Sequence, residues 1–166
     1  IPAIEKLLNF MLSLEAGKSE NRNSSLQIGK FLLQDANAIP LGRLRRSARS
    51  RFVPMLATII EQGVLEGEFH LDNPQLVARI VWEIGEAMEE ALTRPLIEAA
   101  GNRIELSELL NIYNTYTLAI ERVIGAPEKS LCLADDTMLQ SWIATIPRNE
   151  VVGLQTAISP MFPRER

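Results

Sequence analysis

Few side chains in this sequence could take part in metal binding or nucleophilic catalysis, and those that could are isolated from one another. His70 is the only histidine and Cys132 the only cysteine. A zinc site needs three or four nitrogen, sulfur or carboxylate ligands, and neither residue has a second histidine or cysteine near it in the sequence. A single cysteine also forms no disulfide within the chain. We therefore expect no metal site and interpret His70 as a turn residue between two helices.

Three glutamates at helical spacing, Glu83, Glu86 and Glu90, could be compared with the carboxylates of a di-metal helical bundle. Those centres also use two Glu-x-x-His pairs, and one histidine cannot supply them. We interpret the three glutamates as a solvated acidic face of a helix.

Five arginines lie between Arg43 and Arg51. Guanidinium groups on a helix can contact phosphates, but no interleaved aromatic residues and no helix-turn-helix pattern accompany the run. We interpret it as a solvated face or a surface against a neighbouring domain. In a straight helix Arg45 and Arg49 would share the side of Ile60, and buried arginines are unfavourable. We expect either that a kink rotates them outward or that this end of the helix projects beyond the core.

No catalytic motif is recognisable in the chain. The sequence contains neither a G-x-S-x-G nucleophile elbow nor a glycine-rich phosphate loop. We predict that the protein is not an enzyme, that it has no catalytic residues and that it uses no cofactor.

The composition is typical of one globular domain. Of the 166 residues, 46% are hydrophobic and 23% are charged. A chain of this length can form one domain with a sizeable core, and we do not expect a second domain. The net charge of −4 gives no general attraction to nucleic acid or anionic lipid. No run of about 18 apolar residues occurs, so we expect no membrane span. The single cysteine fits a reducing compartment, and we expect a cytoplasmic protein.

Apolar residues recur at spacings of three and four in several segments, which is the helical period, and no segment alternates as a strand does. The predicted fold class is therefore all-α, a helical bundle. Pro54 should kink the third helix, because proline removes a backbone hydrogen bond. The predicted helices span 2–14, 24–35, 40–66, 73–94 and 104–124, with one more at 134–146 and a tail from Val151.

The most informative segment joins the third and fourth of these helices. Gly67 can end one helix in a left-handed conformation, while Asn73 can cap the next helix with Pro74 at its first position. The run I-I-E-Q-G-V-L-E-G-E-F, followed by D-N-P and Q-L-V-A, resembles the corresponding junction of the tetracycline-repressor-like (TetR) transcriptional regulators. The resemblance follows the helix order over residues 1–126 and is specific from Glu61 to Ala78.

This resemblance implies an effector-binding and dimerisation domain over residues 1–126, with residues 127–166 as a C-terminal extension packed on it. In the family an N-terminal helix-turn-helix domain binds DNA, and we expect that domain to be missing from the front of this chain. Effector binding moves the helix that joins the two domains. The implied partners are a second copy of the chain, a small-molecule effector, and DNA only through the missing domain. The alternative is a homodimeric helical scaffold without a small-molecule ligand.

Apolar side chains on the inward sides of different helices could line an effector pocket, because ligand sites in helical proteins lie between helices. Ordinary core packing is the alternative for each of them. No inward lysine or arginine is predicted, so we expect an apolar or amphipathic effector rather than an anion. The predicted ligand-binding residues are Phe31, Phe52, Met55, Ile59, Ile84, Met88 and Tyr113.

The helices at 73–94 and 104–124 are expected, from the resemblance, to pair with their symmetry mates in a four-helix bundle. The predicted inward arc of helix 73–94 contains Val77, Ile80, Val81, Ile84, Met88, Ala91 and Leu92. Trp82 lies outside this arc, and Gly85 costs about 1 kcal/mol relative to alanine, which another closely approaching backbone would explain. Alternatively, Trp82 covers a neighbouring helix or the C-terminal tail. The predicted interface residues are Ala78, Trp82, Gly85, Glu89, Ile112 and Ala119.

Overall fold

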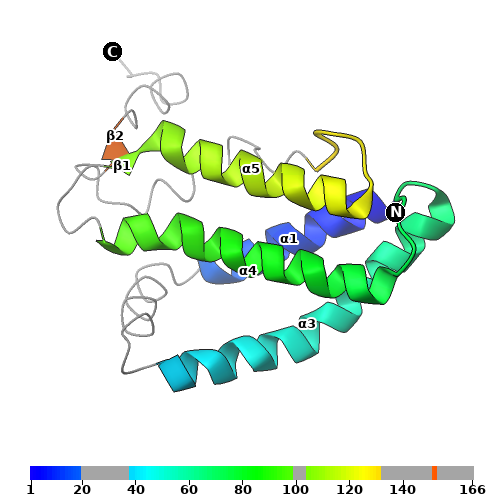
Figure 1. The fold of residues 1–166 in the computed structure, drawn as a ribbon, viewed down its shortest axis with the longest axis horizontal. Coiled ribbons are helices and arrows are strands. Elements are labelled where there is room, and N and C mark those ends of the chain that lie inside the picture. The colour runs from blue at the N-terminus through cyan, green and yellow to red at the C-terminus, as the bar shows by residue number, and fades with distance from the viewer. Residues whose placement is uncertain (20–37, 99–103, 132–150, 153–166) are drawn as a thin grey trace, which may run out of the picture.

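A computed structural model describes residues 1–19, 38–98, 104–131 and 151–152 of the chain (Figure 1). These residues form four helices, α1 (Ala3–Ser19), α3 (Ala38–Glu66), α4 (Pro74–Glu98) and α5 (Leu106–Ile124). The predicted all-α class is confirmed. The helices predicted at 24–35 and 134–146 lie outside the described residues.

The helix boundaries differ from the predicted ones mainly at the ends. Helix α1 continues through Gly17, and α4 continues through Pro95. The first two residues of the helix predicted at 104–124 instead form a short strand, β1 (Ile104–Glu105). This strand pairs in parallel with β2 (Val151–Val152), and Ile104 lies opposite Val151. Two residues are too few to produce an alternating pattern, so this pairing could not be predicted from periodicity.

Helix α4 lies in the middle of the fold. It packs against α3 on one side and α5 on the other, and α1 packs against α3. Figure 1 shows α4 and α5 side by side in front, running in opposite directions, with α1 behind them. Every one of these helices contributes to the main apolar cluster, whose buried members are Ala3, Leu7, Leu56, Ala57, Ile60, Phe69, Ala78, Val81, Ile120, Ile124 and Leu131.

The two halves of α3 have different surroundings. Pro54 lies inside the helix, and the buried residues, Leu56, Ala57, Ile60 and Gly63, all follow it. Figure 1 shows that the two ends of α3 run in different directions, as a kink requires. Residues 38–51, which precede the packed Phe52 and Val53, therefore project beyond the apolar core, which is one of the two outcomes expected for the arginine run.

The turn between α3 and α4 has the predicted capping residues. Gly67 has a φ of +76°, the left-handed conformation that ends α3. The Leu76 N–H donates to Asn73 Oδ1 at 3.0 Å, and Pro74 is the first residue of α4. Gly63 faces the ring of Phe69, and any side chain at position 63 would collide with that ring.

Three side chains at this turn also hold the start of α1, and we name Gln62, Glu66 and Glu68 the α1 clamp. Glu66 Oε2 accepts from the Ala3 N–H at 2.9 Å, and Glu68 Oε2 accepts from the Ile4 N–H at 2.9 Å. Gln62 Nε2 donates to the carbonyl of residue 1 at 3.0 Å. The first N–H groups of a helix have no partner within it, and negative charge is favourable at that end. The carboxylates therefore cap α1 from another part of the chain.

The same turn holds the end of α5. The His70 N–H donates to the Ile124 carbonyl at 3.1 Å, and His70 Nδ1 lies 3.2 Å from the Gly125 carbonyl oxygen. Gly125 has a φ of +66°, and a side chain there would collide with the His70 carbonyl. His70 is thus a turn residue, as interpreted from the sequence.

A buried carboxylate fixes the chain that leaves α5. Glu121 is 2% exposed, and its two oxygens accept from the backbone N–H groups of Lys129 at 2.8 Å and Leu131 at 2.9 Å. Leu131 is thereby drawn into the main apolar cluster.

The α1 clamp should make stability depend on acid pH. The hydrogen bond from Gln62, followed by that from the Ala3 N–H, lowers the pKa of Glu66 below its ordinary value of 4.5. A lowered pKa contributes stability above pH 4.5 that is lost as the pH falls through the folded-state pKa. Glu66→Gln keeps an acceptor but cannot titrate, so its melting temperature should fall less than that of the wild type between about pH 5 and pH 3. Glu128→Gln, which removes an exposed carboxylate, is the control. Parallel pH curves for wild type and Glu66→Gln would contradict this account.

Candidate functional site

The apolar interior along α4 and α5 is divided into two clusters. The main cluster contains Val81 of α4 and Ile120 of α5. A second cluster contains Met88 and Tyr113 of the same helices. Because α4 and α5 run in opposite directions (Figure 1), both pairs lie in order along one interface. We name the level of α4 between Val81 and Met88 the interruption, because no fully buried residue of α4 lies there. Ile84 packs against the main cluster at this level, and Met11 of α1 packs against both clusters.

Gly85 occupies this level on α4. It lies one turn from both Val81 and Met88, which are buried, yet among the described residues no atom lies within 4 Å of the place that a Cβ on Gly85 would take. A glycine inside a helix is unfavourable by about 1 kcal/mol relative to alanine, and no close neighbour here requires one. Gly85 is itself partly exposed, so the space beside it is open toward solvent at the edge of the apolar interior.

Two polar groups near this level are buried without a partner. Thr117 of α5 is 8% exposed, and within the described part of the chain neither its Oγ1 nor Trp82 Nε1 on α4 has a hydrogen-bond partner. Thr117 follows Tyr113 by one helical turn on α5, and Trp82 precedes Gly85 by three residues on α4. Buried polar atoms are almost always hydrogen-bonded in native proteins. A ligand or water molecule in the open space could supply the missing partner.

Three aromatic rings join α1, α3 and α4 beside this space. Phe52 and Trp82 are stacked, with centroids 5.7 Å apart and an interplanar angle of 19°. Phe10 meets Phe52 edge-on at 6.2 Å. Trp82 therefore covers a neighbouring helix, which is the alternative stated for it in the sequence analysis.

Ion pairs join the projecting half of α3 to α4. Arg49 Nη2 lies 2.8 Å from Glu83 Oε1 and 3.2 Å from Glu86 Oε2, and Arg45 Nη2 lies 3.3 Å from Glu90 Oε2. The three glutamates form a face of α4 that is only partly solvated, because it lies against the arginines of α3: Glu83 is 54%, Glu90 36% and Glu86 18% exposed. The arginine side chains remain 42% and 40% exposed for Arg45 and Arg49, so they are paired without being fully desolvated.

Glu90 has a further partner on its own helix. Arg94 Nη2 lies 2.6 Å from Glu90 Oε1, and this hydrogen bond, with a smaller contribution from Arg45, lowers the pKa of Glu90. The glutamate should therefore stay ionised, and paired with α3, to a lower pH than an isolated carboxylate.

The predicted pocket residues are only partly brought together. Met88 and Tyr113 border the interruption, and Phe52 belongs to the aromatic group. Ile59 and Ile84 are half-buried and pack against the main cluster. Sequence reasoning missed Thr117, because a single threonine in an amphipathic helix gives no sign of whether its hydroxyl is paired.

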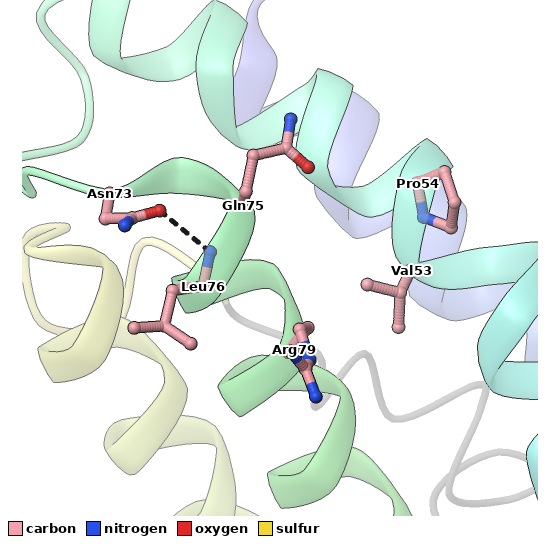
Figure 2. A pocket seen from close by; sticks show the side chains of 6 residues that line it. All are labelled: Val53, Pro54, Asn73, Gln75, Leu76 and Arg79. Carbon is pink, nitrogen blue, oxygen red and sulfur yellow. Dashed lines mark hydrogen bonds between the residues drawn. The ribbon is translucent and has the colours of Figure 1, made fainter.

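Two of the predicted pocket residues lie elsewhere. Met55 is 52% exposed and does not share the inward side, and Phe31 lies outside the described residues. A groove of about 320 Å³ between α3 and the start of α4 (Figure 2) contains none of the seven. Its lining residues are Val53, Pro54, Asn73, Gln75, Leu76 and Arg79.

The predicted dimer-interface residues of α4 face mainly into the chain. Ala78 is fully buried in the main cluster, Trp82 stacks on Phe52, and Gly85 borders the interruption. Only Glu89 is exposed. On α5, Ile112 and Ala119 are half-buried, so part of each remains available to a partner.

A different row of α4 is apolar and exposed. Leu76 is 50% exposed and Ile80 is 41% exposed, and Ala87 is exposed on the same side. The prediction that Ile80 points inward was wrong, because α3 lies against the glutamate side of α4 and the buried arc is rotated toward Ala78. The spacing of Leu76, Ile80 and Ala87 was visible in the sequence, but the position of α3 was not.

Among the described residues no three histidine, cysteine, aspartate or glutamate side chains are placed to hold a metal ion. None of the described helices combines the length and the apolar character needed to cross a bilayer.

The Arg49–Glu86 pair should show measurable but modest coupling. Both partners are partly shielded, Glu86 being 18% exposed, so a double-mutant cycle of Arg49→Met and Glu86→Gln should give about 0.5–1 kcal/mol, falling in high salt. The same cycle on Arg122 and Glu128, whose side chains are 67% and 65% exposed, should give less. Equal coupling for the two pairs in urea denaturation would show that α3 is not held by these charges.

Comparison with known proteins does not extend this description. The chain matches no protein-family model, no curated protein and no solved structure.

Proposed function

We propose that this chain is the effector-binding and dimerisation domain of a TetR-like transcriptional regulator. It takes up a small apolar or amphipathic molecule at the interruption of the core and pairs with a second copy through α4 and α5. The observation that supports effector binding is the open space at Gly85 between two buried apolar clusters. The family assignment rests on the sequence of the α3–α4 junction.

The residues around the interruption favour an uncharged ligand. Met88 and Tyr113 are buried on one side and Val81 on the other. Methionine adapts to irregular shapes, and aromatic rings provide large contact areas. Arg45 and Arg49, the cations that face α4, are already paired with glutamates. An anionic effector would have to compete with those carboxylates.

Helix α1 connects this space to the start of the chain. Met11 packs against both clusters, so a molecule that enters between them meets α1 directly. The first turn of α1 is held by the α1 clamp. In a TetR-like regulator the segment before α1 leads to the DNA-binding domain, and a shift of α1 relative to the clamp would reach that domain.

The second copy is proposed to cover the exposed apolar row of α4. Leu76 and Ile80 are large apolar side chains in contact with water, and Ile112 and Ala119 extend the surface onto α5. Apolar faces of this kind favour burial by about 25 cal/mol per Å². This row replaces Ala78 and Trp82 as the α4 side of the proposed interface.

Binding at the interruption can be tested with N-phenylnaphthylamine, an uncharged dye that fluoresces in apolar sites. The wild type should enhance its fluorescence, and Gly85→Met should abolish the enhancement by filling the space. Gly85→Ala should retain it and raise stability by about 1 kcal/mol, because a methyl group meets no neighbour there. Gly42→Met, at a glycine of α3 that also has no neighbour, is the control. Equal enhancement by wild type and Gly85→Met would refute the site.

The dimer can be tested by sedimentation equilibrium at micromolar concentration. Leu76→Glu combined with Ile80→Glu should raise the dissociation constant by at least about 100-fold, because two buried apolar contacts are replaced by charges. Leu44→Glu, at a residue of α3 that is 56% exposed, should have no effect. A monomeric wild type would exclude the dimer. A dimer without dye binding would favour the scaffold alternative.

A further inference from the structure

Part of the positive charge on α3 has no counterpart within the fold. Residues 38–60 contain five arginines and neither aspartate nor glutamate. Arg45 and Arg49 are paired with glutamates of α4. Arg43 and Arg46 are exposed instead, and within the described part of the chain they form no ion pair. The projecting end of α3 therefore presents cations that the described chain does not neutralise.

These two arginines belong to one row of α3, which we name the arginine row. Its members are Ile39, Arg43, Arg46, Ser50 and Val53. They follow one another at spacings of three and four, so they share one side of the helix. All of them precede Pro54, so the kink does not interrupt the row. Ile39 is 72% exposed, and the row thus has an apolar residue at each end with cations between them.

The Val53 end of the arginine row opens into the groove of about 320 Å³ (Figure 2). Val53 and Pro54 line the groove from α3, and Leu76 lines it from α4, so much of its surface is apolar. Arg79 is a further lining residue; it is exposed, and it has no ion pair among the described residues. A groove of this volume lies at the lower end of the range for ligand sites, and it can hold one large apolar side chain beside a carboxylate.

We infer that the arginine row and the adjoining groove bind an extended acidic peptide segment of a partner protein. An apolar side chain of the segment occupies the groove, and carboxylates that follow it pair with Arg46 and Arg43. Guanidinium groups bind carboxylates through two parallel hydrogen bonds, which gives geometric specificity as well as attraction. The surface thus offers a partner complementary charge and an apolar anchor in one continuous strip.

A peptide uses both parts of this surface, whereas a nucleic acid would use only one. Phosphate contacts are made by cations and polar groups, and an apolar groove adds nothing to them. The net charge of −4 on the whole chain also opposes the approach of a long polyanion. A short acidic segment lies within a Debye length of the arginines, so their local charge outweighs the net charge of the chain.

The spacing along the helix determines the spacing required in the peptide. At a rise of 1.5 Å per residue, Arg46 lies about 10 Å, Arg43 about 15 Å and Ile39 about 21 Å from Val53 along the axis. An extended peptide advances by about 3.3 Å per residue. Carboxylates should therefore follow the anchor by about three to five residues, and a second apolar side chain should follow it by about six. The peptide L-D-E-E-D-E-L has this pattern.

Binding is tested by fluorescence anisotropy with rhodamine-labelled L-D-E-E-D-E-L and the full chain. The wild type should bind this peptide, with an affinity that decreases as salt is added. Arg43→Gln combined with Arg46→Gln should raise the dissociation constant about tenfold, as expected for the loss of two exposed charge pairs. Both side chains are exposed and unpaired, so folding should be unaffected. Arg122→Gln, at an arginine of α5 that is 67% exposed, is the matched control.

Two further peptides separate the contributions of charge and groove. L-N-Q-Q-N-Q-L keeps the leucines without the charge, and S-D-E-E-D-E-S keeps the charge without the leucines. Each should bind at least about tenfold more weakly than L-D-E-E-D-E-L, because each lacks one of the two contacts. Equal binding of S-D-E-E-D-E-S would overturn the role of the groove. Equal affinity of the wild type and the double arginine variant, or no binding, would overturn the inference. Tighter binding of a short labelled DNA duplex, lost in the double variant, would assign the row to nucleic acid instead.

This inference does not rest on the proposed function. Arg43 and Arg46 lie on α3, outside the exposed row of α4 that is proposed to meet a second copy. Leu76 is shared by that row and the groove, while Val53 and Pro54 provide the part of the anchor surface that lies outside the row. Peptide binding by a monomeric wild type would support the inference while excluding the dimer, and a dimer that binds no peptide would do the reverse.

Discussion

The turn between α3 and α4 is the constraint on which the rest of the fold depends. Its carboxylates, Glu66 and Glu68, cap the first turn of α1, and His70 holds the last turn of α5. Elements that are far apart in the sequence are thus fixed at one point, where a glycine at position 125 permits the close approach. Apolar packing then extends from this point along the helices, and the main cluster contains the residues closest to it.

The candidate site lies where that packing stops. Main-cluster packing continues along α4 through Val81 to the half-buried Ile84, and a separate cluster begins at Met88. Between them the orientation of α4 is set less by apolar contacts than by the ion pairs with α3 and by the stacking of Trp82 on Phe52. At this level of α4, ion pairs and aromatic stacking take over part of the role that buried apolar contacts have elsewhere in the fold.

Local signals in the sequence were sufficient for the helices but not for their faces. Gly67, Asn73 and Pro74 act through the backbone of their own neighbours, so their roles were predictable from residue type. The rotation of α4 depends on where α3 lies, and α3 is positioned by charges on both helices. A helical wheel contains only one helix, so it placed Ile80 inside and Trp82 outside. The unpaired hydroxyl of Thr117 is likewise a property of the assembled structure.

The first half of α3 is held to α4 by ion pairs, whereas the second half is held by buried apolar contacts. No residue of α3 before Leu56 is buried, and the ion pairs that bind this half to α4 are accessible to water and ions. Local openings begin where few apolar contacts must be broken. The amide hydrogens of residues 38–51 should therefore exchange with solvent through openings that leave the second half of the helix intact. Residues 38–51 of α3 would then detach reversibly from α4 while the remaining helices stay folded.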